Sequence, residues 1–268
     1  MELAVEHDTT YAYATPLRYS IQYLRLRPHQ SAQQSVRQWS VKGPEPLSQF
    51  RDGFGNDVEV LSLTKPHQSF TVSVRGRVST VANGGPSDED ETLPPAVFLR
   101  ATHLTAPNAP LIDLARSGAK GAAGIEMLER LVERVCGAVS YRGGVTGSAT
   151  TAAEALNTGA GVCQDLSHVL ICCSRELGMP ARYISGYYWA DPNGIDYEAN
   201  HAWAEVYVPE HGWIAFDPAN KQRVNDTYVR LASGLDYLDA APVRGTRRGG
   251  GTENLTVRVR VAQAQGQQ

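Results

Sequence analysis

The sequence lacks the features that mark a membrane-spanning or exported protein. No apolar run approaches the ~20 residues that a helix needs to cross a bilayer. The N-terminus, Met-Glu-Leu-Ala-Val-Glu-His-Asp, is acidic and has neither the basic n-region nor the apolar h-region of a secretory signal. We therefore expect a cytoplasmic location and no membrane partner.

The chain has almost no excess of charge of either sign, and it contains few cysteines. A net charge of -3 over 268 residues gives no reason to expect nucleic acid as a partner. The four cysteines, Cys136, Cys163, Cys172 and Cys173, do not have the spacing of a zinc site, and adjacent cysteines are poor disulfide partners. They are expected to be reduced, as in a cytosolic compartment. No calcium-loop motif of the Asp-x-Asp-x-Asp-Gly kind is present either, so we expect no metal and no organic cofactor.

The first 80 residues have the period-two alternation of β-strands, interrupted by proline and glycine. Several short strands with turn signals between them predict a small β-sandwich-like domain over residues 1–80. An acidic, Gly/Pro-rich segment at 81–97 follows and is the predicted linker. The predicted strands of this region are 3–13, 23–27, 36–41, 58–63 and 70–74, with a glycine-rich turn at 51–57.

After the linker the apolar period changes to 3.6, so we predict an α+β core over residues 98–251. Helices are expected at 111–116 and 125–139, and Thr151 with Glu154 forms a capping box that opens another. Beyond Pro180 the pattern returns to strands at 181–189, 201–208 and 213–217. Residues 221–251 are expected to be irregular, with a last C-terminal strand within 252–262 and a disordered tail at 263–268.

Cys163 stands between small residues and a helical pattern. Val162, Leu166, Val169 and Leu170 follow the spacing of one buried helix face, and Gly178 provides a stop. Cys163 is therefore expected at a helix N-terminus, where unpaired N–H groups and the helix dipole favour an anion. This environment lowers the pKa of a thiol and favours a reactive thiolate.

A predicted hairpin provides partners for this thiol. His201 opens one strand and Asp217 ends the next, directly before Pro218. The two side chains share a sheet face only if the register is even, which a three-residue loop at 209–211 or a bulge would produce. They would then be diagonal neighbours, about 7–8 Å apart at the backbone. We predict Cys163 as nucleophile, His201 as base and Asp217 as the group that orients the imidazole.

Three blocks resemble the core of the bacterial transglutaminase-like superfamily of cysteine enzymes. They are Gly-Val-Cys-Gln-Asp at 161–165, His-Ala-Trp-Ala-Glu-Val-Tyr-Val at 201–208 and Gly-Trp-Ile-Ala-Phe-Asp-Pro-Ala-Asn at 212–220. The segments 25–28, 52–56, 231–237 and 242–245 resemble one bacterial branch that carries a β-rich N-terminal region. The resemblance implies a papain-like α+β core with a Cys-His-Asp triad, and it carries Cys163, His201 and Asp217 over as catalytic residues.

Four other residues are weaker candidates for the site. Gln164 is a candidate second oxyanion donor beside the backbone N–H of Cys163, although helix-start packing also explains it. Trp203 could form a wall of the cleft, but a core aromatic is the more common role. Asn220 and Tyr187 could line the site by proximity. Asp165 is expected to complement the helix dipole.

The remaining cysteines and histidines are expected to have structural or surface roles. Cys173 is expected to fill the core, and Cys136 and Cys172 to be partly buried thiols. His168 is expected to point away from the thiol because it lies about 140° around the helix from Cys163. The other histidines, His7, His29, His67, His103 and His211, are expected at the surface or in a turn.

These residues predict a thiol enzyme that acts on an amide of a peptide or protein through a thioester acyl-enzyme. Hydrolysis as a peptidase or amidase is preferred, because water requires no second substrate pocket. The alternative is acyl transfer to an amine, as in a protein-glutamine transglutaminase. A third reading is a non-catalytic binding or scaffold module of the same fold. The particular substrate and the oligomeric state are not predicted.

Overall fold

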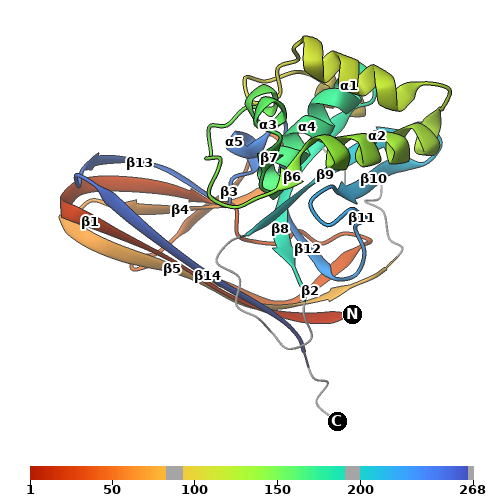
Figure 1. The fold of residues 1–268 in the computed structure, drawn as a ribbon. Helices are drawn as coiled ribbons and strands as arrows, with labels where there is room; N and C mark the ends of the chain where they lie inside the picture. The colour runs from red at the N-terminus through yellow and green to blue at the C-terminus, as the bar shows by residue number, and fades with distance from the viewer. Residues whose placement is uncertain (83–92, 191–199, 265–268) are drawn as a thin grey trace.

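The structure, a computed structural model, describes residues 1–82, 93–190 and 200–264. It is an α+β protein in which a curled, β-rich region lies beside a core of helices on an antiparallel sheet (Figure 1). The predicted fold class is therefore confirmed. No helix among the described residues is long and apolar enough to cross a membrane.

The β-rich region is one sheet built around the unusually long strand β1 (Glu2–Leu24). The alternate residues Leu3, Val5 and Tyr11 are buried in its first half, and Ala14, Thr15 and Pro16 interrupt the alternation. The first half pairs mainly with β5 and β14, and the second half with β4 and β13. Because β1 bends, the sheet curls, and its buried apolar residues share one core with Tyr187, Val229 and Leu231 of the α+β part (Figure 1). Its other strands are β2 (Gln34–Lys42), β3 (Ser48–Arg51), β4 (Asp57–Leu63), β5 (His67–Thr80), β13 (Val243–Gly249) and β14 (Glu253–Gln263).

The C-terminal part of the chain differs from the prediction. Residues 221–251 are not irregular, because they contain β11 (Gln222–Arg223), β12 (Tyr228–Gly234), the short helix α5 (Tyr237–Ala240) and β13. The predicted strand at 252–262 is confirmed as β14, which extends to Gln263 in the segment predicted to be disordered. Both β13 and β14 pair with β1, so the chain returns to the sheet that its first residues form. These pairings depend on contacts more than 200 residues apart and leave no local pattern.

The core is a five-stranded antiparallel sheet covered on one face by helices. Its strand order is β11-β10-β9-β8-β12, and α4 (Cys163–Glu176) packs on β8 and β9 (Figure 1). Small and branched residues on the helix-facing side of β9, namely Ala202, Ala204, Val206 and Val208, allow α4 to approach closely. The predicted helices and capping box are confirmed. The remaining bounds are β8 (Ala181–Tyr188), β9 (His201–Val208), β10 (Gly212–Asp217), α1 (Ala109–Ala119), α2 (Gly124–Ala138), α3 (Ala152–Thr158), β6 (Ser140–Tyr141), β7 (Ala160–Gly161) and a 3-10 turn (Pro95–Leu99).

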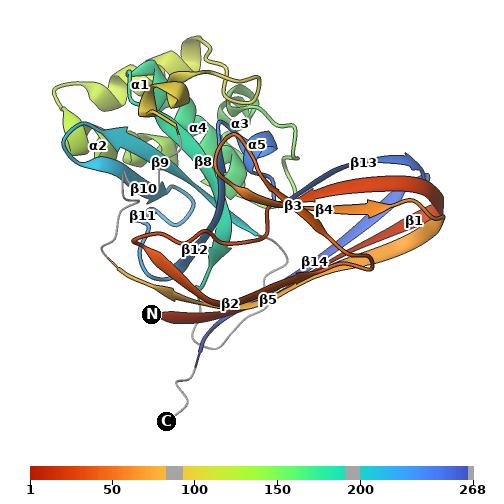
Figure 2. The same cartoon turned by 180° about the vertical axis from the view of Figure 1, so that it is seen from behind.

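Two side-chain amides join the β-rich region to β12, the edge strand of the core sheet. Asn56 accepts from the Ser233 N–H at 2.8 Å and donates to the Ser233 carbonyl at 2.8 Å. Gln34 makes the same pair of bonds to the backbone of Arg230 at 2.9 and 2.8 Å. Each amide thus satisfies backbone groups that an edge strand would otherwise leave open. Asp52 holds Asn56 in place through bonds to its backbone and side chain, and Figure 2 shows the core and the β-rich region side by side from behind.

The domain boundaries at 80, 97 and 251 remain a prediction. Most of the predicted linker lies outside the described residues, as do the last four residues of the predicted tail.

Candidate active site

Cys163 is the first residue of α4, and the turn before it is held by a buried carboxylate. Asp165 accepts from the Val162 N–H at 2.7 Å and from the Thr146 hydroxyl at 2.6 Å. A side chain at Gly161 would collide with Asp165, because its Cβ would lie 2.6 Å from the Asp165 Cβ. Asp165 therefore caps the helix that carries the thiol, and burial raises the pKa of its carboxyl. The Cys163 side chain is partly exposed and sits where the helix dipole favours an anion.

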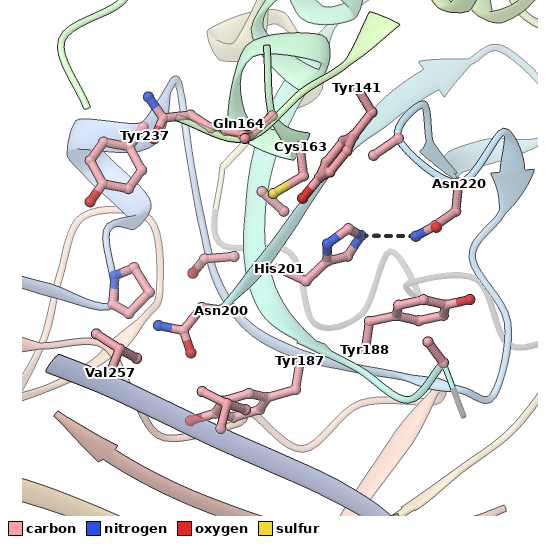
Figure 3. Close-up of a pocket in the computed structure, with 18 of the residues that line it drawn as sticks. Tyr141, Cys163, Gln164, Tyr187, Tyr188, Asn200, His201, Asn220, Tyr237 and Val257 are labelled. Carbon is pink, nitrogen blue, oxygen red and sulfur yellow. Dashed lines mark hydrogen bonds between the residues drawn. The ribbon is translucent and has the colours of Figure 1, made fainter. Parts of the chain in front are cut away.

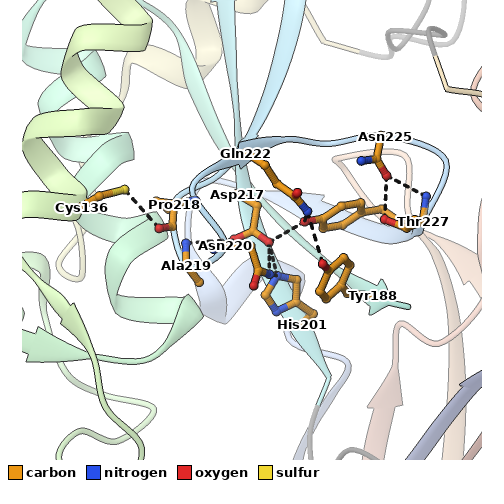
Figure 4. Close-up of polar contacts among 11 residues, drawn as sticks. Cys136, Tyr188, His201, Asp217, Pro218, Ala219, Asn220, Gln222, Asn225 and Thr227 are labelled. Carbon is orange, nitrogen blue, oxygen red and sulfur yellow. Dashed lines mark hydrogen bonds and ion pairs between the residues drawn. The ribbon is translucent and has the colours of Figure 1, made fainter. Parts of the chain in front are cut away.

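His201 and Asp217 are brought together by the hairpin of β9 and β10. Val208 pairs with Gly212, so the loop contains the three residues 209–211 and the register is even, as predicted. His201 and Asp217 consequently lie on the same sheet face as diagonal neighbours. His201 Nε2 is 2.6 Å from Asp217 Oδ2, which leaves the other ring nitrogen facing Cys163 (Figures 3 and 4).

Asp217 is fully buried and accepts several hydrogen bonds besides the one from His201. Its Oδ1 accepts from the backbone N–H groups of Ala219 and Asn220 (Figure 4). Its Oδ2 accepts from the Tyr228 hydroxyl at 2.7 Å. Burial alone would raise the pKa of this carboxyl, but the bonds and charge of His201 and the bonds of Tyr228 and Asn220 lower it. Asp217 is thus a fixed carboxylate that favours a protonated imidazole.

The electrostatics of His201 follow from its two partners. Burial lowers the pKa of the imidazole, but hydrogen bonds to Asp217 and Cys163 and the charges of both outweigh burial and raise the pKa to about 10. The ring is therefore protonated at neutral pH. This arrangement suits a thiolate–imidazolium pair, in which the sulfur attacks and the ring supplies a proton.

The thiol opens into a cleft of about 950 Å³ between the core and the curled sheet. Cys163, Tyr141 and His201 line one end of it, and Tyr187 and Val257 line the opposite end (Figure 3). The cleft is thus lined by both parts of the molecule. Its volume is at the upper end of the range for ligand pockets, so it can hold several groups of a substrate at once.

Of the four weaker candidates, Asn220, Gln164 and Tyr187 line the cleft and Trp203 does not. Asn220 lines the cleft, donates to Asp217 Oδ2 at 2.6 Å and lies 3.5 Å from His201 Nε2. Gln164 lines the cleft, but it donates to the Ser148 carbonyl and points away from Cys163 (Figure 3). Tyr187 also lines the cleft. Trp203 does not: it is 1% exposed and packs behind His201 against Tyr228, in space that the missing side chain of Gly186 leaves open.

Tyr141, Asn200 and Ser185 are among the cleft residues that the sequence did not single out. Tyr141 lies on β6, which pairs with β7 directly before Cys163, and its hydroxyl points toward the thiol (Figure 3). Tyr141 is 62% exposed, but partial desolvation at the cleft and the charges of Cys163 and Asp217 raise the pKa of its hydroxyl, which is therefore a neutral donor. Asn200 precedes His201, and Ser185 lies on β8. Adjacency to His201 was a usable signal for Asn200, but a two-residue strand carries no pattern that would have indicated Tyr141.

The other thiols are buried or bonded elsewhere. Cys172 and Cys173 are 1% and 0% exposed, so Cys173 fills the core as predicted while Cys172 is more buried than predicted. Burial raises the pKa of Cys172 to about 12 and also raises that of Cys136, which lies against the Pro218 carbonyl (Figure 4). All four cysteines are free. These three thiols serve as internal references for the reactivity of Cys163.

One expectation about the histidines is wrong. His7 is 1% exposed and bonds the Tyr187 hydroxyl at 2.8 Å and Thr9 at 2.7 Å, because it lies on the inward face of β1 that the core covers. His168 is fully buried, and its Nε2 accepts from the Tyr237 N–H. Among the described residues, no group of three or more His, Cys, Asp or Glu side chains is placed to hold a metal ion.

The α+β fold is that of a transglutaminase-like core, and comparison with known proteins identifies the family. Residues 112–218 match the transglutaminase-like superfamily, and residues 3–79 match the bacterial transglutaminase-like N-terminal region. The chain belongs to the transglutaminase-like superfamily and carries this N-terminal region.

The relatives support this assignment along the whole chain. An uncharacterised protein of Mycobacterium tuberculosis is 31% identical over 90% of this chain and 86% of its own length. A relative in Mycobacterium leprae is 26% identical over 97% of this chain and 98% of its own. The crystal structure of a candidate cysteine protease from Cytophaga hutchinsonii has the same fold, with a TM-score of 0.79, 23% identity and coverage of 100% of this chain and 92% of that one.

Proposed function

We propose that this protein is a cysteine-dependent enzyme that cleaves an amide bond through a thioester acyl-enzyme. The observation that carries the proposal is the His201 ring, which bonds Asp217 at 2.6 Å on one side and Cys163 on the other, in an open cleft. A nucleophile, a base and an orienting group in contact are what acyl transfer by a thiol requires. Cys163, His201 and Asp217 take these roles.

The first half-reaction forms the thioester. The Cys163 sulfur attacks the amide carbonyl carbon, and the carbonyl oxygen becomes an oxyanion. The backbone N–H of Cys163, which has no acceptor within its own helix, and the Tyr141 hydroxyl are the two proposed donors to this oxyanion. The C–N bond then breaks as His201 gives its proton to the leaving nitrogen, and the amine departs.

The second half-reaction restores the enzyme. Water attacks the thioester carbon while His201 takes one of its protons, and the C–S bond breaks to release a carboxylic acid. The products leave Cys163 as thiolate and His201 protonated, as at the start. Asp217 keeps the ring oriented throughout, because its own position is fixed by Tyr228, Ala219 and Asn220.

Hydrolysis is the preferred outcome, and transfer of the acyl group to an amine is the second candidate. A protein-glutamine gamma-glutamyltransferase of Pseudomonas aeruginosa is 29% identical over 102 residues, which cover 34% of this chain and 15% of that protein. This partial similarity keeps amine acceptance open as an alternative to water. Both reactions share the first half-reaction.

Alkylation with iodoacetamide at pH 7 tests the proposal. We expect Cys163 to react at least about tenfold faster than Cys136 or the buried Cys172, measured by mass spectrometry of peptides, because Cys163 opens into the cleft and its imidazolium partner favours the thiolate. The variant His201→Gln should remove this advantage. Equal rates at the three cysteines would refute thiolate activation and favour a scaffold of the same fold.

Turnover then separates the two reactions. A library of peptides and amides, with Cys163→Ala as the blank, should yield free acids without added amine. Products that form only with an added primary amine would instead assign the protein as an acyltransferase.

A further inference from the structure

The cleft beside Cys163 extends well beyond the reacting groups, to a wall that the curled sheet supplies. Val257 and Val259 on β14 and the buried Pro242 line it, together with Tyr187 and Tyr237 of the core. Val257 pairs with Thr9 of β1, so this wall is held by strands from both ends of the chain. Figure 3 shows Val257, Tyr187 and Tyr237 across the cleft from the thiol.

The wall is continuous with the apolar core of the β-rich region. Tyr187 and Val259 are 1% and 3% exposed and belong to that core, and Val257 packs against it. A ligand group in contact with these side chains therefore meets a preformed apolar surface rather than a flexible loop. The phenol rings of Tyr187 and Tyr237 add faces and edges against which an aromatic group can pack.

Within the described ranges, the lining of the cleft offers no charged partner to a ligand at this end. None of its described lining residues is Asp, Glu, Lys or Arg, and His201 at the other end is committed to Asp217 and Cys163. A charged ligand group placed here would lose its hydration without gaining an ion pair, which is strongly unfavourable. An uncharged group loses far less.

Two buried polar atoms in the lining lack a hydrogen-bond partner among the described residues. They are the Ser185 hydroxyl oxygen and the Asn200 side-chain carbonyl oxygen. Asn200 lies between His201 and Tyr187, with its amide directed into the cleft (Figure 3). Because an unsatisfied buried polar atom is costly, these atoms are suited to bond an amide group of a bound ligand.

We infer that this end of the cleft binds an uncharged, apolar side chain, preferably aromatic, next to the scissile amide of the substrate. The wall of Val257, Val259 and Pro242 makes the curled sheet part of the substrate site, and Asn200 and Ser185 bind the amide linkage. The inference rests on the proposed function, because it specifies the substrate of the same thiol.

The experiment compares two thiol reagents that differ only in the group the wall would bind. The rate constants for Cys163 with N-benzyl iodoacetamide and with iodoacetamide are measured at pH 7, each divided by the rate constant of the same reagent with glutathione. In the wild-type protein the normalised ratio should favour the benzyl reagent by about ten- to hundredfold, the value expected for burying an aromatic ring.

The variants locate the contact on β14. Val257→Lys should reduce the normalised ratio to below about threefold, because the ring would meet a charged side chain. Thr256→Lys is the matched control: it adds the same charge at the neighbouring, exposed position and should keep the wild-type ratio. Val257→Thr, which preserves shape and replaces one methyl group with a hydroxyl, should give an intermediate ratio and covers the case in which lysine disturbs the strand.

Each outcome bears on a different claim. A normalised ratio near one in the wild-type protein would overturn the apolar subsite. A benzyl preference that survives both Val257 substitutions would overturn the role of this wall. If Cys163 reacts with iodoacetamide no faster than Cys136 or Cys172, the proposed function itself fails, which is a distinct result.

Discussion

At His201, burial and charge act on the imidazole in opposite directions. Burial lowers the pKa of the ring, whereas hydrogen bonds and charges from Asp217 and Cys163 raise it to about 10. Because the pKa in the folded protein is higher than the usual value near 6.5, protonation of His201 stabilises the folded state. This stabilisation is complete below about pH 6.5 and is lost as the pH rises through 10.

This sign gives a test of the pair by protein stability. Between pH 7 and 10.5, the free energy of unfolding should fall more in the wild-type protein than in His201→Gln. The extra loss should be up to about 1.4 kcal/mol for each pH unit in which His201 is protonated in the folded state only. Urea denaturation at both pH values measures it, and the other titrating groups are common to the two proteins. A parallel decline in wild type and variant would contradict the raised pKa.

Tyr141 provides a second test at the scale of one residue. Tyr141→Phe removes the proposed oxyanion donor and should lower kcat by about tenfold to a thousandfold while leaving the iodoacetamide rate of Cys163 within about twofold. Alkylation at an sp³ carbon forms no oxyanion, so the two readouts separate the roles. Tyr23→Phe, at an exposed position on the curled sheet, is the control. A kcat unchanged in Tyr141→Phe would remove this hydroxyl from the mechanism.

At the scale of elements, the placement of the thiol depends on how α4 begins. Asp165 satisfies the Val162 N–H and the Thr146 hydroxyl, and it packs against Gly161, so the turn before Cys163 has one conformation. The capping box of Thr151 and Glu154 opens α3, whose described residues do not line the cleft.

The two caps therefore make a matched comparison. Asp165→Ala and Thr151→Ala should each cost about 1 kcal/mol of folding free energy, with a larger loss at Asp165 because Thr146 also loses its partner. Only Asp165→Ala should lower the iodoacetamide rate of Cys163, by about fivefold or more, because the thiol then loses its fixed position at the helix dipole. Equal alkylation rates in the two variants would show that the cap does not position the thiol.

At the scale of the whole molecule, the curled sheet is attached to the core through β12. The Asn56 amide pairs with both backbone groups of Ser233, and Gln34 does the same at Arg230. Two segments that resemble the family, 25–28 and 52–56, meet at this joint. Arg25 donates to Asp52, and Asp52 accepts from the Asn56 side chain. These bonds hold Asn56 where it pairs with Ser233 of β12.

Removing this joint should affect both stability and the cleft. Asn56→Ala leaves the N–H and C=O of Ser233 unpaired and should lower the free energy of unfolding by about 2–4 kcal/mol. It should also lower the normalised ratio of the benzyl reagent to iodoacetamide toward one, because the β14 wall belongs to the sheet that this joint holds. Asn254→Ala, on the exposed part of β14, is the control in both assays. A stable Asn56→Ala protein with the wild-type preference would contradict this role.

The sequence by itself determined the parts of this protein that depend on local periodicity. The helix behind Cys163, the even register that brings His201 to Asp217, and the change from β-rich to α+β organisation all follow from side-chain alternation over a few residues. Only the tertiary structure decided three features. They are the pairing of β13 and β14 with β1, the burial of His7, and a cleft lined together by Tyr141, Asn200 and Val257. Those features arise from pairings between distant segments. Their free energy depends on the whole fold and cannot be predicted from a short stretch of sequence.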